Sequence, residues 1–204
     1  MPPRRWEGKR DDLWTVYQRL QENLIKGGLS GRNAKGKRAR TRSVNGIDGD
    51  IIYLTLNGNK QGLISAGCST YDSIGNRYQQ NHTDEILVYS TDYELSRRQN
   101  VSHAHFVFVK ADDKASPLLL SSIANNELFE CEFKYHRIDK SGGLLHYKTV
   151  KLTKASVVKI GNVHPDSLTD NEAYPKETIS LKYESITANH HAASTSGYSI
   201  SDNI

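Results

Sequence analysis

The chain has 204 residues, a formal net charge of +4 and a hydrophobic content of 36%. This length accommodates one sizeable domain with an appendage, and the composition is that of a soluble globular protein. No apolar run is long enough for a transmembrane helix, and no apolar segment follows the basic N-terminal residues, so we expect neither membrane insertion nor a Sec-type signal peptide.

The positive charge is concentrated in the first quarter of the chain. Residues 1–48 hold 12 Lys and Arg against 5 Asp and Glu, whereas the remaining residues hold 15 against 18. Apolar residues at helical spacing predict one short helix over about residues 12–26, and residues 29–49 are predicted to be a flexible basic linker. We therefore expect residues 1–49 to form a basic N-terminal extension, partly helical and partly disordered.

The basic residues within 29–43 also allow a second interpretation. Clustered Lys and Arg neutralise phosphates, which makes this stretch a candidate nucleic-acid contact, although no aromatic residue is interleaved for base stacking. The candidate contacts are Arg32, Lys35, Lys37, Arg38, Arg40 and Arg42. Residues 31–37 have the spacing of a phosphate-binding loop, but Arg38 replaces the hydroxyl that binds magnesium and no strand precedes the loop, so we expect no nucleotide site.

From residue 50 the apolar period becomes that of β-strands. Alternate residues of 51–56 are apolar, which predicts a strand with Tyr53 on a half-exposed face. Residues 57–59 read Asn-Gly-Asn, which favours a hairpin turn into a second strand that continues towards Tyr71.

The following stretch, residues 74–84, is polar and has no clear period. Loops of this length are uncommon in compact β domains and are often functional. Two interpretations stay open, a partner contact and a mobile surface loop. The candidate contact residues are Asn76, Arg77, Tyr78, Gln79, Gln80, His82 and Asp84.

Further strands and one helix are predicted beyond this stretch. The predicted strands cover residues 85–95, 105–109, 128–136, 145–152, 155–160 and 178–183. Ser116 as cap and Pro117 at the first position predict a helix over residues 116–125. Residues 128–136 alternate most cleanly, which places Phe133 in the core and His136 on the wet side. Short strands at hairpin spacing with one helix predict a mainly β, antiparallel barrel or sandwich, and the Ser-rich tail from Ala192 is expected to fray.

The chemistry-bearing residues do not form a recognisable active site. Cys68 and Cys131 lie in strand-like runs and are expected to be small buried residues. His103 with His105, and His190 with His191, lack a third ligand at a recognised spacing. There is also no nucleophile elbow and no convincing carboxylate pair. We therefore expect a binding or structural module with no catalytic, metal or cofactor site.

Residues 50 to about 198 closely resemble the Hcp (haemolysin-coregulated protein) family of bacterial type VI secretion systems, in its enterobacterial branch. The resemblance is carried by Ile-Ile-Tyr-Leu-Thr-Leu-Asn-Gly from Ile51, Gln-Gly-Leu-Ile-Ser-Ala-Gly-Cys from Gln61, Asp-Glu-Ile-Leu-Val-Tyr from Asp84 and Ser-Leu-Lys-Tyr-Glu-Ser-Ile-Thr from Ser180. It implies a non-catalytic β-barrel with a flanking helix, assembled as a homo-hexamer. It also implies that the rings stack into the inner tube that a contractile sheath expels.

The resemblance further implies partners and a location. The partners are sheath, spike and baseplate proteins, together with small effector proteins in the ring lumen. The protein would be made in the bacterial cytoplasm and exported to the extracellular space or a target cell by type VI secretion. The loop at residues 75–84 fits an element used between subunits or rings. The alternative hypothesis is a prophage-derived nucleic-acid-associated protein that uses the basic segment 29–43.

The first part of the chain departs from the Hcp pattern. From about Asp12 to Asp48 it instead resembles the C-terminal part of an uncharacterised prophage protein family, as in Asp-Leu-Trp-Thr-Val-Tyr-Gln from Asp12. We therefore expect a fusion joined near Gly49, with an extension at 1–49, an Hcp-like barrel at 50–198 and a tail at 199–204.

Overall fold

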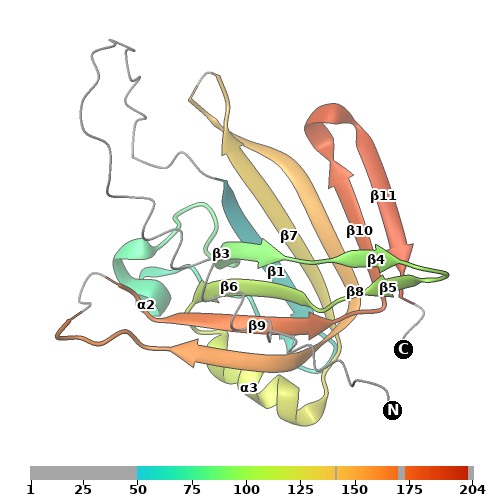
Figure 1. Cartoon of the computed structure of the whole chain (residues 1–204). Helices are drawn as coiled ribbons and strands as arrows, with labels where there is room; N and C mark the ends of the chain where they lie inside the picture. The colour runs from blue at the N-terminus through green and yellow to red at the C-terminus, as the bar shows by residue number, and fades with distance from the viewer. Residues whose placement is uncertain (1–49, 141, 170–172, 202–204) are drawn as a thin grey trace, which may run out of the picture. The chain divides into compact units, whose positions relative to one another are not determined.

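The computed structural model describes residues 50–140, 142–169 and 173–201 (Figure 1). The predicted N-terminal helix and basic linker lie outside these residues and stay predictions. Among the described residues, no helix has the length and apolar character needed to cross a membrane.

The described elements are mostly antiparallel strands. The strands are β1 (Ile51–Gly58), β2 (Gly62–Leu63), β3 (Ile86–Asp92), β4 (Leu95–Arg97), β5 (Val101–His103), β6 (Phe106–Ala111), β7 (Phe129–Ile138), β8 (Leu144–Val163), β9 (Lys176–Lys182), β10 (Ser185–His190) and β11 (Thr195–Ile200). The helices are α2 (Tyr71–Ile74), α3 (Ser116–Asn125) and the 3-10 turns η1 (Gly75–Arg77) and η2 (His191–Ala193).

Six strands close into a barrel. In the order β8-β7-β1-β3-β6-β9 each strand pairs with the next, and β9 pairs back onto β8. The β10–β11 hairpin extends the sheet from the free side of β8, and β4 with β5 forms a separate two-stranded sheet. The predicted mainly β, antiparallel barrel with a flanking helix is confirmed.

The 20-residue strand β8 makes this closure possible. Its first half pairs with β7 as far as Ala155, and its second half pairs with β9 from Ser156 onwards. Lys154, at the junction, has φ +45°, in the left-handed region that few non-glycine residues adopt. The strand therefore bends there and changes its pairing partner from β7 to β9. The two strands predicted at 145–152 and 155–160 are wrong in this respect, because they are one bent strand.

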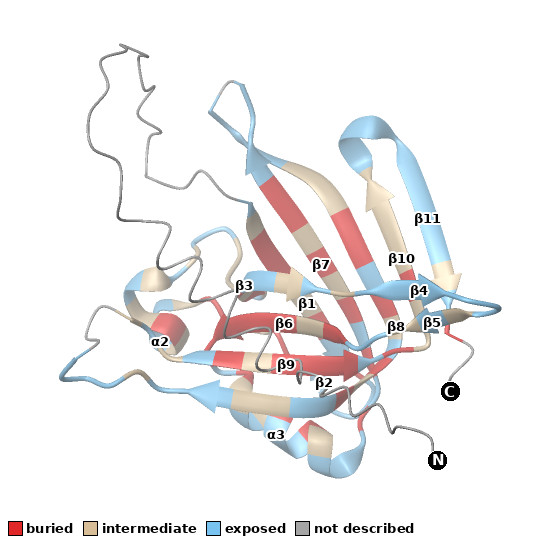
Figure 2. Ribbon diagram, in the orientation of Figure 1, coloured by how far each residue is buried: buried red, intermediate tan, exposed pale blue. Residues whose placement is uncertain are grey.

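Alternating apolar residues fill the barrel (Figure 2). Every second residue of β1 and β7 points inward, as expected for strands with one face on the core. Phe133 is fully buried and contacts the rings of Phe106 and Phe108, with centroids 4.6 and 5.4 Å away. Ile179, Leu181 and Tyr183 of the predicted strand 178–183 are buried as expected.

The outward face of these strands departs from expectation at two aromatic residues. Tyr53 and His136, both predicted on a solvated face, are only 2% and 7% exposed. The reason is that residues 71–85 fold back over the outer surface of β1 and β7 and cover them. The second strand of the predicted hairpin is also much shorter than expected, because β2 contains only Gly62 and Leu63 before the chain turns towards α2.

The helix α3 begins as predicted, but its cap differs. Ala115 is the N-cap residue, and it has no side chain that could cap the helix. The hydroxyl of Ser116 instead accepts a hydrogen bond from Lys110 Nζ at 3.0 Å and donates one to Glu177 Oε2 at 2.7 Å. The additional short helix α2 was not predicted.

The buried ammonium of Lys110 joins β6, β9 and the start of α3. Lys110 is fully buried, and its Nζ lies 2.8 Å from both Asp113 Oδ1 and Glu177 Oε2. It also donates to the backbone carbonyl of Ala111 at 2.8 Å. Four acceptors around one ammonium keep the charge satisfied, as a buried ion requires.

The described part of the C-terminal tail contains a paired strand. Residues Thr195–Ile200, predicted to fray from Ala192 onwards, form β11 and pair with β10 through a register from Ser185 opposite Ile200 to His190 opposite Thr195. That part of the prediction is wrong, because backbone pairing with β10 compensates for the weak apolar character of the Ser-rich sequence.

Replacing Lys110 by Ala should destabilise the barrel by about 3–5 kcal/mol, because two buried carboxylates lose their common cation. Lys182→Ala is the matched control, since Lys182 is exposed on the neighbouring strand. Chemical denaturation measures both variants. A difference between them of less than about 1 kcal/mol would contradict the importance of the buried cation.

Candidate functional site

Residues 71–85, here called the 71–85 segment, form a compact excursion on the outside of the barrel. The single turn of α2 ends at Gly75, whose φ of +61° suits glycine and redirects the chain into η1. Ile74 is the buried apolar anchor of this turn. The segment is therefore held in place at its start, although it is polar and has no period in the sequence.

Three contacts hold the middle and end of the segment on β1 and β7. Tyr53 of β1 donates its hydroxyl to Gln79 Oε1 at 2.8 Å. The ring of His82 stacks on Tyr53, with centroids 3.8 Å apart and planes 8° apart. Glu85 Oε1 accepts a hydrogen bond from Lys134 Nζ at 2.7 Å. These contacts explain why Tyr53 is buried on the outer face of the sheet.

The protonation states of Tyr53 and Glu85 agree with the hydrogen bonds that the two side chains make. Burial, together with the charge of Glu85, raises the pKa of Tyr53 to about 12, so its hydroxyl stays protonated and can donate to Gln79. Burial raises the pKa of Glu85, but hydrogen bonds from Lys134 and His82 lower it by more, so the net pKa lies below its ordinary value. Glu85 is therefore an anion at neutral pH.

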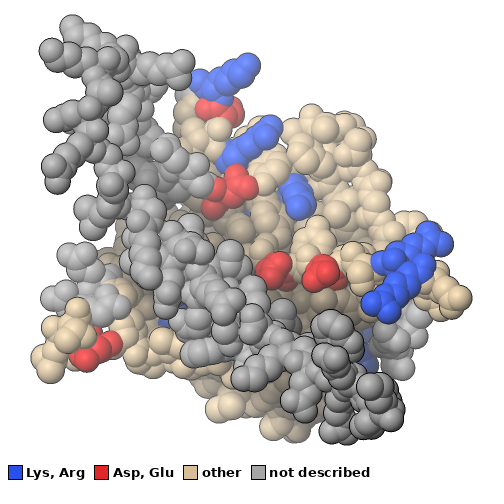
Figure 3. Space-filling view, in the orientation of Figure 1, with Lys and Arg blue, Asp and Glu red and all other residues tan. Residues whose placement is uncertain are grey.

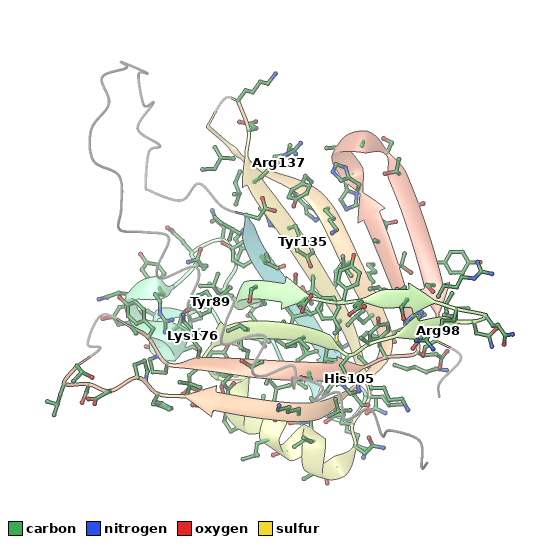
Figure 4. All side chains as sticks on the ribbon, viewed as in Figure 1. Tyr89, Arg98, His105, Tyr135, Arg137 and Lys176 are labelled. Carbon is green, nitrogen blue, oxygen red and sulfur yellow. The ribbon has the colours of Figure 1, made fainter. Side chains whose placement is uncertain are left out.

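Arg77 attaches the segment to a second place on the barrel. Its guanidinium hydrogen-bonds to the hydroxyl of Tyr89 and lies over the ring of Tyr174, 4.5 Å from the centroid. Lys176, at the start of β9, also lies near Tyr89, with its Nζ 5.8 Å from the centroid of the Tyr89 ring (Figure 4). Cations placed over tyrosine rings are attractive even at exposed sites.

The structure divides the seven predicted contact residues into two groups. Arg77, Gln79 and His82 are occupied by the contacts with the barrel described above. The other four are exposed and are Asn76, Tyr78, Gln80 and Asp84. Tyr78 is 49% exposed and packs edge-on against Tyr71, which is 62% exposed. An exposed aromatic pair among polar residues is a suitable contact surface, although its use in assembly stays a prediction.

Behind the segment lies an open pocket of about 480 Å³. Its lining residues are Asn81, His82, Thr83, Asp84, Glu85, Lys134, His136 and His146. Five residues of this region were not predicted to belong to it: Tyr53, Glu85, Lys134, His136 and His146. The sequence did contain one indication of this site. Lys134 and His136 alternate with core residues of the same strand, which places both side chains together on its outer face.

The potentially nucleophilic residues are not activated. Cys68 and Cys131 are free and buried, as predicted. Burial, reinforced by the charge of Asp113, raises the pKa of Cys68 to about 12, and burial also raises the pKa of Cys131. Neither thiol is a thiolate at neutral pH, and the thiolate is the reactive form.

The histidines of the two pairs noted in the sequence make separate contacts. His103 contacts Ser199 Oγ at 2.9 Å and packs beside Tyr183, whereas His105 is exposed. His190 Nδ1 accepts from the backbone N–H of Ala193 at 3.1 Å. Within residues 50–140, 142–169 and 173–201, no three His, Cys, Asp or Glu side chains are arranged to hold a metal ion.

The candidate nucleic-acid contacts at residues 29–43 lie outside the described residues. On the face shown in Figure 3, Lys and Arg gather at the end of the β4–β5 hairpin, where Arg97 and Arg98 are exposed, with acidic side chains close by.

Comparison with known proteins places this architecture in a family. Residues 53–190 match the family described as "Type VI secretion system effector, Hcp". The solved structure of secreted protein Hcp3 from Pseudomonas aeruginosa superposes with a TM-score of 0.69 at 32% identity, covering 76% of this chain and all of that one. The Major exported protein of Pseudomonas aeruginosa is 33% identical, covering 71% of this chain and 91% of its own length.

Two further similarities involve much longer proteins of Escherichia coli K12. The protein YhhZ is 37% identical over 147 residues, which are 72% of this chain and 36% of YhhZ. The UPF0380 proteins YafZ and YfjQ are each 71% identical over 51 residues, which are 25% of this chain and 19% of theirs. The chain thus spans well under two thirds of these relatives, and two different families match it.

The predicted resemblance is confirmed by a family match covering more than half of the chain, a barrel that superposes on a solved member, and 33% identity across nearly the whole of an exported relative. This chain belongs to the Hcp family of the type VI secretion system.

Proposed function

We propose that the chain is a subunit of the expelled inner tube of a type VI secretion system, assembled as stacked hexameric rings. The observation that carries this proposal is the family match over residues 53–190 on a closed, self-contained barrel. A tube needs a rigid repeating unit, and a barrel whose strands pair in a closed circuit is such a unit.

The geometry supports particular surfaces for assembly. Closed rings use the same pair of patches on every subunit. The 71–85 segment presents Asn76, Tyr78 and Gln80 outward while its other residues are anchored. Strand β11 is a sheet edge among the described residues, and Tyr198 on it is 78% exposed. Both features are available to a neighbouring copy.

The same proposal includes partners and location. The ring lumen holds small effectors, and sheath, spike and baseplate proteins contact the tube. The protein is made in the bacterial cytoplasm and leaves the cell by type VI secretion. Its role is structural, without a catalytic residue or cofactor. The family match supports a structural role.

The domain arrangement is part of the proposal. An Hcp-like barrel at residues 50–198 follows an extension at 1–49 derived from a second family, and the 51-residue similarity to YafZ and YfjQ supports this origin. The alternative, a nucleic-acid-associated protein using residues 29–43, is not favoured, because the Hcp similarity covers most of the chain.

Native mass spectrometry of the full chain tests the assembly. We expect a hexamer, and negative-stain microscopy should show rings. A strictly monomeric protein at high concentration would refute the proposal.

Deleting residues 1–48 should improve tube formation. The segment carries a net charge of +7, from 12 basic and 5 acidic residues, and a hexamer brings six copies close together. Tube lengths measured by electron microscopy at low and high salt separate charge repulsion from steric blocking. Equal lengths with and without the extension would contradict this expectation.

Replacing Tyr78 by Ser should reduce assembly about tenfold, the effect of losing about 1.4 kcal/mol from one contact. Leu168→Ser is the matched control, because Leu168 is 90% exposed in the loop before β9. Sedimentation measures assembly, and thermal unfolding verifies that both variants fold. Equal assembly of the two variants would show that Tyr78 is not a contact.

A further inference from the structure

A row of four imidazole rings crosses the outside of the barrel. The rings of His82, His136, His146 and His191 follow one another with centroids 5.5, 4.9 and 4.7 Å apart. They come from the 71–85 segment, β7, β8 and η2 respectively. The first ring is also stacked on Tyr53. The row therefore connects the segment to three elements that are distant in sequence.

The packing around His136 fits a neutral ring. His136 is only 7% exposed, and its Nδ1 has no hydrogen-bond partner. Protonation would place a positive charge on this buried ring, and the backbone acceptor at Lys134 and the charge of Glu85 offset the effects of burial and of the neighbouring histidines only in part. Burying a charge that is incompletely compensated is costly.

The other end of the row is also suited to neutral rings. Thr149 Oγ1 lies 2.9 Å from His146 Nε2 and 2.7 Å from His191 Nε2. A single hydroxyl can donate to one ring and accept from the other only if one Nε2 is unprotonated. When both rings are imidazolium, the hydroxyl hydrogen loses its acceptor and two cations face each other.

The charged groups around the row do not compensate for four added protons. Those that face it from the segment, β7 and β8 are Asp84, Glu85, Glu132, Lys134 and Lys151. Glu85 is already paired with Lys134, and Glu132 lies 3.5 Å from Lys151. Lys148 is turned to the ring of Tyr135, and His190 packs against Tyr147.

We propose that this imidazole row is an acid-sensitive latch, which holds the 71–85 segment on the barrel at neutral pH and releases it when the rings are protonated. The predicted consequence for ring assembly rests on the proposed function, in which the segment contacts a neighbouring subunit. The release itself requires only the contacts described above.

The direction of the pH dependence follows from the two central rings. Burial lowers the pKa of His136, with further lowering by the charges of His146 and His82. Burial also lowers the pKa of His146, with further lowering by His191. In the released state His136 loses the neighbouring ring of His82 and part of its burial, so its pKa returns towards the ordinary value of about 6.5. Its contribution to docking is therefore complete above about pH 6.5 and is lost as the pH falls towards its lowered pKa.

The ring of His82 acts in the opposite direction. Its Nδ1 contacts Glu85 Oε2, so a proton on His82 strengthens that pair.

Hydrogen exchange of the full chain at pH 7.5 and 5.5, corrected for intrinsic rates, tests the latch. We expect peptides from the 71–85 segment to exchange at least about threefold faster at pH 5.5, while those of β6 and β9 are unchanged. His146→Gln should abolish most of this difference, and His105→Gln, at an exposed position, should not. His191→Gln, at the exposed end of the row, replaces His146→Gln if that variant does not fold.

The outcomes separate the latch from the proposed function. Unchanged exchange of the segment in the wild type, or an equal increase in every peptide, overturns the latch. Native mass spectra at both pH values report assembly independently. Faster exchange at pH 5.5 in a protein that forms no hexamers at either pH supports the latch and refutes the proposed tube subunit. Hexamers whose segment exchanges at the same rate at both pH values support the tube subunit and refute the latch.

Discussion

The structure depends on one strand that belongs to both sides of a barrel. β8 pairs with β7 before Lys154 and with β9 after it, and the left-handed backbone of Lys154 provides the bend. Without this bend, β9 would be a sheet edge and the core around Phe133 would be open on one side. Because the six barrel strands pair in a closed order, most of their backbone N–H and C=O groups are hydrogen-bonded within the chain, and few are left to pair with another molecule.

Closure also determines where the chain can make contacts. The barrel interior is filled by side chains, so the surfaces available to other molecules lie on the additions to it: the 71–85 segment, the β4–β5 hairpin and the β10–β11 hairpin. The β10–β11 hairpin is attached by a backbone ladder to β8, whereas the 71–85 segment is attached by side-chain contacts. In the 71–85 segment, His82 stacks on Tyr53 of β1 and Arg77 lies over the ring of Tyr174, so the partners that hold the segment come from different parts of the barrel domain.

The inner face of the barrel could be predicted from the sequence, whereas the outer face could not. Period-2 alternation identifies Phe133 as core because only local spacing matters. The burial of Tyr53 and His136 depends on residues 20 or more positions away folding back over them, and no local pattern encodes that return. The bend at Lys154 was missed for a related reason, since lysine carries no signal for a positive φ. The pairing of β11 was hidden by its Ser-rich sequence, because backbone hydrogen bonds are insensitive to side-chain type.

The inner and outer faces of the barrel strands therefore differ in how their packing depends on pH. On β7, Phe133 packs in an apolar interior, whereas His136 packs among other imidazole rings. A period of two places these environments on opposite sides of one backbone. An acid-sensitive attachment can thus be built on the outer face without placing an ionisable histidine in the core, so the barrel keeps its shape while an outer segment is held or released.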